Sequence, residues 1–120
     1  MKTILLVEDE FTLRRALGIF LEDEGYDVVA VTNGEEAWVQ AQEDVFDLVL
    51  TDLRMPVMDG IELVKRLRSL PQYTKTPIFI LSANNEQSLV DAGLQAGATG
   101  WLNKPFPVER LLEVVQQALA

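Results

Sequence analysis

The chain has 120 residues, of which 48% are hydrophobic, so it matches a single compact domain with a core of its own. It contains no cysteine and no histidine, which excludes disulfides, thiolate chemistry and the commonest general base and metal ligand. The formal net charge of −9 argues against a nucleic-acid surface and favours cations or basic protein partners.

Short apolar runs alternate with helical patterns along the whole chain. In chain order the pattern predicts strand 4–7, helix 13–21, strand 28–31, helix 34–44, strand 48–51, helix 60–69, strand 78–81, helix 86–96, a weaker strand 101–102 and helix 108–119. Because parallel neighbours require crossover connections, this alternation predicts one α/β domain, residues 1–120, with a doubly wound five-stranded parallel sheet and five flanking helices.

The N-terminal segment "MKTILLVEDE" does not have the character of a targeting sequence. Only four consecutive apolar residues precede its acids, too few for a signal peptide, and no longer apolar span could cross a bilayer. We therefore expect a cytoplasmic protein that binds neither a membrane nor nucleic acid directly.

Polar side chains stand where the predicted strands end. They are Glu8 and Asp9 after the first strand, Asp52 after the third, Ser82 after the fourth and Lys104 after the fifth. Each has an ordinary alternative: the acids could belong to solvated turns, the serine could cap the fourth helix, and the lysine could lie on the surface. However, sheets of this kind bind ligands at the carboxyl ends of their strands, so all five side chains are predicted to form one site.

The chemistry of such a site follows from its charges. Two carboxylates ~4 Å apart repel by about 4 kcal/mol at an effective dielectric constant of about 20, so a cation is needed there. Ligands that are all oxygen favour a hard ion, and Mg²⁺ is usually held by a few carboxylates and water. A magnesium ion, an ammonium group and a hydroxyl around one carboxylate form a receptor for a phosphoryl group, with Asp52 able to act as the nucleophile.

The sequence closely resembles the receiver domains of two-component response regulators, and among them chemotaxis regulators, over essentially its whole length. The matching segments are the acid pair in "LLVEDE", the pattern "DLRMPVMDG", the hydroxyl in "ILSA" and the segment "LNKPF". This resemblance implies a flavodoxin-like fold with strand order 2-1-3-4-5. It also implies that the chain is a signalling switch and not an enzyme. Such a switch catalyses only its own phosphotransfer and autodephosphorylation.

The resemblance further implies the partners of the chain. A sensor histidine kinase or a histidine phosphotransfer protein would supply the phosphoryl group. A downstream effector protein or domain would bind the surface formed by the fourth helix, fifth strand and fifth helix.

For the metal and the nucleophile, the resemblance assigns roles to four residues. Asp52 is the implied phosphoacceptor, and Asp9 is a direct Mg²⁺ ligand. Glu8 acts through a metal-bound water, and the backbone carbonyl of Arg54 completes the protein's share of the metal ligands.

Other roles implied by the resemblance concern binding of the phosphoryl group, switching and lifetime. Ser82 and Lys104 bind the phosphoryl oxygens, the lysine across a cis bond to the proline that follows it. Ser82 and Trp101 form the switch, although the family usually has Tyr or Phe where this chain has Trp101, which puts the geometry of switching in question. Arg54 and Asn84 flank the path of attacking water and would set the lifetime of the phosphorylated state.

Two alternative functions remain from the sequence. A pseudo-receiver that binds partners without phosphorylation should lack some of these site residues, and a phosphatase of the haloacid dehalogenase type should carry an acid two residues after its nucleophile. Asp52 is instead followed by Leu53 and Arg54, and no GxxxxGK or GxGxxG signature is present. Whether the chain is a single-domain regulator or a receiver from a larger protein stays open.

Overall fold

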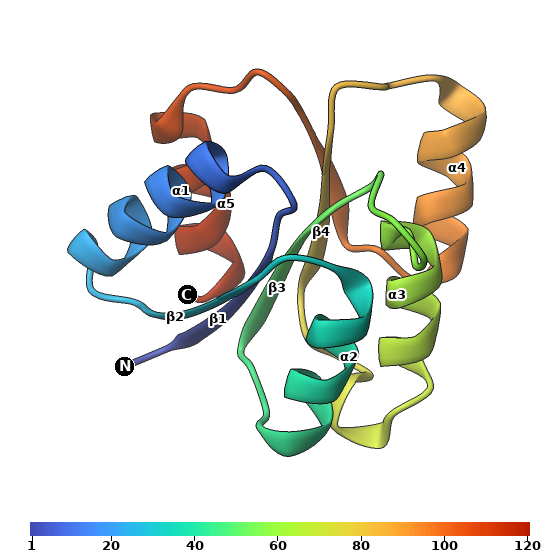
Figure 1. Ribbon diagram of the computed structural model, residues 1–120, viewed down its shortest axis with the longest axis horizontal. Coiled ribbons are helices and arrows are strands. Elements are labelled where there is room, and N and C mark those ends of the chain that lie inside the picture. The colour runs from blue at the N-terminus through green and yellow to red at the C-terminus, as the bar shows by residue number, and fades with distance from the viewer.

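A computed structural model describes all 120 residues and shows a parallel sheet between two layers of helices (Figure 1). The strands are β1 (Thr3–Val7), β2 (Asp27–Val31), β3 (Leu48–Asp52), β4 (Ile78–Ser82) and β5 (Gly100–Asn103). The helices are α1 (Phe11–Asp23), α2 (Gly34–Glu43), α3 (Gly60–Arg68), α4 (Gln87–Ala96) and α5 (Val108–Ala118). The order β2-β1-β3-β4-β5 confirms the predicted doubly wound, flavodoxin-like fold. A short 3-10 helix, η1 (Pro71–Tyr73), was not predicted.

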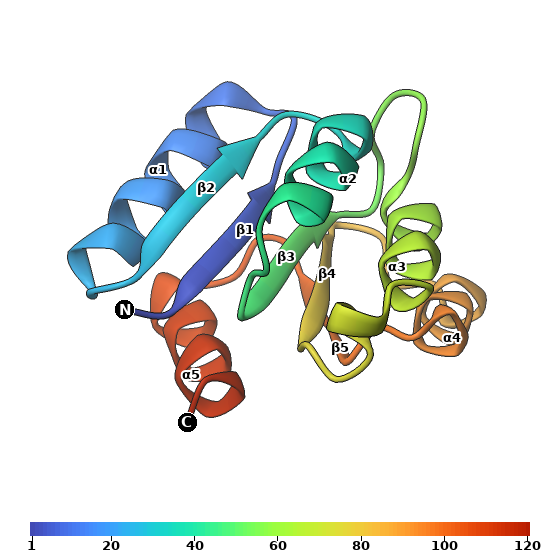
Figure 2. The same ribbon diagram turned by 90° about the horizontal axis from the view of Figure 1, so that it is seen from below.

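The two helical layers explain why the strands are apolar on both faces. Helices α1 and α5 cover one face of the sheet, and α2, α3 and α4 cover the other (Figures 1 and 2). In β1, Leu5 and Val7 pack into the core on the α2–α4 side, whereas Ile4 and Leu6 pack on the side of α1 and α5. Alternate residues of a strand point to opposite faces, so a strand covered on both sides needs a continuous apolar run.

The strand register brings the functional candidates to one edge. Val7 of β1 pairs with Thr51 of β3, Asp52 pairs with Leu81 of β4, and Ser82 is the last residue of β4. The strand order reverses between β1 and β3, which is where open α/β sheets bind ligands.

The turn after β3 is built around a close approach of the backbone. The amide of Gly60 donates a hydrogen bond to the carbonyl of Leu53 at 2.8 Å, and a Cβ atom at Gly60 would lie 2.2 Å from the carbonyl oxygen of Asp52. Asp59 caps α3 by accepting a hydrogen bond from the amide of Glu62 at 2.8 Å. A glycine is therefore required where α3 begins against the end of β3.

Val57 in this turn adopts a strained conformation. Its φ is 71°, its side chain is 88% exposed, and the amide of Met58 donates to the carbonyl of Pro56 at 2.8 Å, which is the hydrogen bond of a γ-turn. A β-branched residue is rarely found at positive φ, and a strained backbone of this kind costs about 1–3 kcal/mol.

We expect Val57→Gly to raise the free energy of unfolding by about 1 kcal/mol, as measured by urea titration, because glycine relieves the strain but loses some conformational entropy.

Val45→Gly is the matched control for this prediction. Val45 is also exposed, but it lies outside the left-handed region, so the same change should lower stability there. Equal losses of stability in the two variants would contradict the strain at Val57.

None of the helices combines the length and the apolar character that crossing a bilayer requires.

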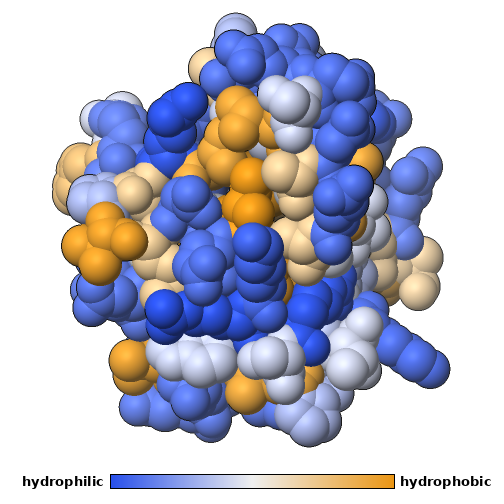
Figure 3. All heavy atoms as spheres, turned by 90° about the vertical axis from the view of Figure 1, so that its right-hand side faces the viewer, coloured by the Kyte–Doolittle hydropathy of each residue, from blue (hydrophilic) through white to orange (hydrophobic).

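On the side of the molecule where α3 and α4 lie, apolar side chains gather between hydrophilic ones (Figure 3). A hollow between the β3–α3 turn and α4 is lined in part by Met55, Ile61 and Leu89, which are partly buried and pack against the core cluster on that face of the sheet. The core thus extends to the surface beside the turn that follows Asp52.

Candidate functional site

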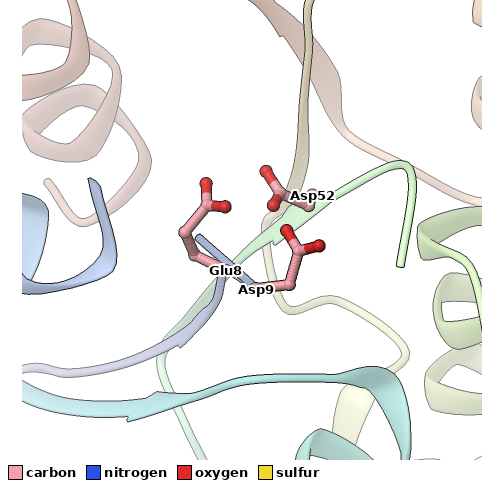
Figure 4. A group of neighbouring side chains, drawn as sticks. All are labelled: Glu8, Asp9 and Asp52. Carbon is pink, nitrogen blue, oxygen red and sulfur yellow. The ribbon is translucent and has the colours of Figure 1, made fainter. Parts of the chain in front are cut away.

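Three carboxylates meet at the carboxyl edge of the sheet. Glu8 and Asp9 follow β1 and Asp52 ends β3, and one oxygen from each lies within 4.8 Å of the others. Their side chains point toward one another (Figure 4). Glu8 and Asp52 are 1% and 4% exposed, whereas Asp9 is exposed to solvent. A converging set of oxygen donors, partly open to water, fits Mg²⁺, which keeps several waters when it binds to protein.

Lys104 is the only basic residue that forms ion pairs with these acids. Its Nζ lies 2.8 Å from Oε1 of Glu8 and 2.5 Å from Oδ1 of Asp52. The side chain is 23% exposed, so both ion pairs are largely shielded from water. The peptide bond between Lys104 and Pro105 is cis, as the resemblance implied. The lysine therefore offsets part of the repulsion between the two buried carboxylates.

Burial and mutual proximity shift the pKa values of these groups. Burial is the largest cause that raises the pKa of Asp52 to about 8, with Glu8 adding to the rise and Lys104 opposing it. Burial also opposes ionisation of Glu8, but bonds with Asp52, with Lys104 and with the amide of Glu10 lower its pKa. Burial likewise disfavours the Lys104 cation, yet its bonds to the two acids raise its pKa. The metal-free site thus holds an ionised Glu8, a cationic Lys104 and an Asp52 that retains its proton to unusually high pH.

A single pocket collects the predicted residues of the site. It is lined by Glu8, Asp9, Glu10, Asp52, Arg54, Leu81, Ser82, Ala83, Asn84 and Lys104. The structure therefore brings together every predicted metal, phosphoryl and lifetime residue, and leaves only Trp101 outside the pocket. The predictions did not include Glu10, which caps α1 with its carboxylate.

Ser82 is held at the end of β4 by the backbone that follows it. Its Oγ accepts a hydrogen bond from the amide of Asn84 at 3.0 Å, and its side chain faces the pocket. The alternative that Ser82 caps the fourth helix is wrong, because α4 begins at Gln87 and Glu86 is its N-cap residue.

Trp101 lies on β5 directly opposite Ile80 of β4. It is partly buried, and its ring packs so closely against α4 that a Cβ atom at Gly93 would lie 2.8 Å from Cζ3 of the indole. Ser82 is two residues beyond Ile80 on β4, so its side chain lies on the same face of the sheet as those of Ile80 and Trp101. The indole N–H is buried without an acceptor.

Sequence reasoning missed Arg14, which contacts the backbone of the acid pair. Its Nη1 donates to the carbonyl of Glu8 at 3.0 Å and lies 3.4 Å from the carbonyl of Asp9. The signal available in the sequence was a basic residue near the start of a helix, where the helix dipole favours acids instead.

Comparison with known proteins identifies the family. A sequence profile of the response regulator receiver domain matches residues 4–116. The structure is similar to that of the chemotaxis protein CheY4 of Vibrio cholerae, with a TM-score of 0.95, 40% identity and 99% of each chain covered. The chain therefore belongs to the response regulator receiver domain family.

Another similar structure is relevant to the metal. It is the receiver domain of the sensor histidine kinase PA1611 from Pseudomonas aeruginosa PAO1, which has a magnesium ion coordinated in its active-site cleft. The TM-score is 0.91 at 33% identity, with 98% of this chain and 97% of that one covered.

The curated relatives are longer proteins. Response regulator GtcR of Aneurinibacillus migulanus is 39% identical over 97% of this chain and 47% of its own length. The transcriptional regulatory protein SrrA of Staphylococcus aureus is 38% identical over 92% of this chain and 45% of its own. The chain thus spans about half the length of these relatives. Membership of the family implies phosphorylation-dependent signalling.

Proposed function

We propose that this chain is a phosphorylation-activated switch of the cytoplasm. Asp52 accepts a phosphoryl group, with Mg²⁺, from a phosphohistidine of a sensor histidine kinase or phosphotransfer protein. The phosphorylated domain then changes its affinity for an effector through the face formed by α4, β5 and α5. The observation that carries this proposal is the buried Asp52 carboxylate, which opens into a pocket lined by three further acids, a lysine and a hydroxyl.

The transfer requires that Asp52 attack phosphorus in line with the departing group. A carboxylate oxygen forms the new O–P bond while the N–P bond to the donor imidazole breaks, and the donor nitrogen keeps the electron pair and takes up a proton. Lys104 already contacts Asp52, so its ammonium group lies beside the incoming phosphoryl oxygens, and Ser82 can donate its hydroxyl hydrogen to one of them.

Glu8, Asp9, Asp52 and the backbone carbonyl of Arg54 would hold Mg²⁺ in this pocket. When bound, the ion supplies the charge that neutralises the phosphoryl oxygens. We propose no catalytic activity beyond this transfer and autodephosphorylation. Arg54, whose side chain is exposed, and Asn84, which is partly buried, lie at the same pocket and are proposed to set the lifetime of the phosphorylated state by limiting the access of water.

Intact-mass analysis tests the proposal directly. After incubation with Mg²⁺ and acetyl phosphate, the wild-type chain should gain one phosphoryl group, and Asp52→Asn should gain none because the amide cannot act as the nucleophile. Asp59→Asn is the control, since Asp59 is an exposed acid of the same loop and should leave the gain intact. No gain in the wild type would contradict the proposal and favour a pseudo-receiver.

The proposed switch should report itself through tryptophan fluorescence. Beryllofluoride with Mg²⁺ imitates an aspartyl phosphate, and we expect it to change the emission of Trp101. A charge-assisted hydrogen bond of about 1.5–3 kcal/mol would draw Ser82 toward the acceptor, which shifts a two-state equilibrium by roughly ten- to a hundredfold. Space opens on the face that Ser82 shares with Trp101, so the indole can move.

Two variants and the second tryptophan complete this experiment. Trp101→Phe should abolish the emission change, and Ser82→Ala should weaken it, while Asp52 in Trp101→Phe should still be phosphorylated. Trp38 lies on α2 and provides an unresponsive background. If the change persisted in Trp101→Phe, Trp38 would be the sensor and the aromatic switch would be refuted.

A further inference from the structure

Arg14 is the one cationic side chain that bonds the backbone of both residues in the acid pair. It lies in the first turns of α1 and is partly buried. Its Nη1 reaches the carbonyl of Glu8 at 3.0 Å and that of Asp9 at 3.4 Å, and its guanidinium carbon lies 5.4 Å from the centre of the Phe11 ring. One guanidinium nitrogen therefore bridges two successive carbonyls, and the phenyl ring supports the side chain from one side.

The two carboxylates of the pair depend on this contact to different degrees. Glu8 is held through its own carboxylate, which accepts hydrogen bonds from Nζ of Lys104 at 2.8 Å and from the amide of Glu10 at 3.1 Å. Asp9 has no such support: its carboxylate is exposed and accepts no hydrogen bond in the structure. The position of the Asp9 side chain is therefore set by its backbone, and Arg14 contacts that backbone at the carbonyl.

We propose that Arg14 is a positioning residue for the metal site, which fixes the Glu8–Asp9 backbone so that the Asp9 carboxylate faces Asp52. This inference rests on the proposed Mg²⁺ site. Groups that orient metal ligands affect affinity by roughly tenfold or more when they are removed.

The sign of the effect separates positioning from simple electrostatics. A guanidinium close to the acid pair repels Mg²⁺, so loss of its charge alone would tighten metal binding. Loss of its hydrogen bonds frees the Asp9 backbone and weakens metal binding. These two contributions oppose each other. The positioning role requires that the weakening caused by the lost hydrogen bonds exceed the tightening caused by the lost charge.

The experiment is a calorimetric titration of Mg²⁺ into the full chain at one pH. Arg14→Gln is expected to weaken Mg²⁺ binding by roughly tenfold. Arg15→Gln removes the same charge from an exposed neighbour that makes no hydrogen bond to the acid pair, and should bind Mg²⁺ as tightly as the wild type or slightly tighter. Arg14→Lys keeps the charge and one donor group, and should recover part of the affinity.

Urea unfolding in EDTA tests whether each variant is folded at the titration temperature. For a folded variant, a weaker affinity reports on the site and not on the fraction folded. If Arg14→Gln failed to fold, Arg14→Lys would carry the same comparison, with an affinity below that of the wild type. Unchanged or tighter binding by Arg14→Gln, or equal weakening in Arg15→Gln, would overturn the positioning role. A wild-type chain that binds no Mg²⁺ would overturn the metal site itself, and the inference with it.

Discussion

Lys104→Met should lower the free energy of unfolding of the metal-free protein by about 3 kcal/mol near pH 9, or roughly 10 °C in Tm. Nζ of Lys104 lies 2.8 Å from Glu8 and 2.5 Å from Asp52, and both carboxylates are almost completely buried. Removing the cation leaves two buried acids facing each other, and a buried ion pair that loses one member is strongly destabilised.

The loss should depend on pH in a definite direction. Burial and Glu8 raise the pKa of Asp52 to about 8 although Lys104 opposes the rise, so removal of Lys104 raises this pKa further. Above pH 8 the wild-type carboxylate is ionised beside Lys104, whereas in Lys104→Met the ionisation of Asp52 is opposed by the unshielded charge of Glu8. The deficit of Lys104→Met should therefore be larger near pH 9 than near pH 7, and should shrink when Mg²⁺ is added near pH 9.

Urea unfolding in EDTA at the two pH values measures this deficit. Lys75→Met is the matched control, because Lys75 is exposed and forms no ion pair, and its stability should match that of the wild type within about 0.5 kcal/mol. A deficit in Lys104→Met that did not change with pH would show that lost packing of the lysine stem, rather than unpaired charge, was responsible.

The site could be predicted from the sequence because its residues stand at strand ends. In a parallel sheet the carboxyl ends of all strands lie at the same edge. An acid at the end of one strand and a lysine after another therefore lie at that edge, however far apart they are in the chain. Lys104 and Glu8 are 96 residues apart, and their 2.8 Å contact follows from the strand order and from the length of the lysine side chain.

Other features could not be predicted because they depend on packing between elements. The contact of Trp101 with Gly93 depends on how closely α4 approaches β5, which no periodicity reveals. The bonds from Arg14 depend on the rotamer of one side chain and on carbonyls that carry no sequence signal. The positive φ of Val57 goes against local preference, since glycine or asparagine would have indicated it.

Mg²⁺ affinity should rise with pH by up to tenfold per unit between roughly pH 6 and pH 8 and level off above that range. Magnesium needs an ionised Asp52, whereas the pKa of this carboxyl in the metal-free fold is raised to about 8, chiefly by burial. A proton therefore competes with the metal.

The raised pKa of Asp52 also makes the stability of the metal-free protein depend on pH. An acid whose pKa is higher in the folded than in the unfolded state binds more protons when folded. The metal-free protein should therefore lose stability as pH rises from roughly 4 to 8.

Calorimetry in two buffers with different heats of ionisation measures both the affinity and the protons released. Near pH 7 the wild-type chain should release about one proton for each Mg²⁺ bound, because the ion displaces the proton from Asp52. Asp52→Asn has no carboxyl to titrate at this position, so it should bind Mg²⁺ more weakly, release almost no proton and show a flat profile. Because the pKa of Glu8 is lowered, Glu8 is already ionised across this range and adds no second step. An affinity in the wild type that is independent of pH would mean that Lys104 keeps Asp52 ionised at neutral pH, and that the ammonium group outweighs burial in setting the charge of the phosphoacceptor.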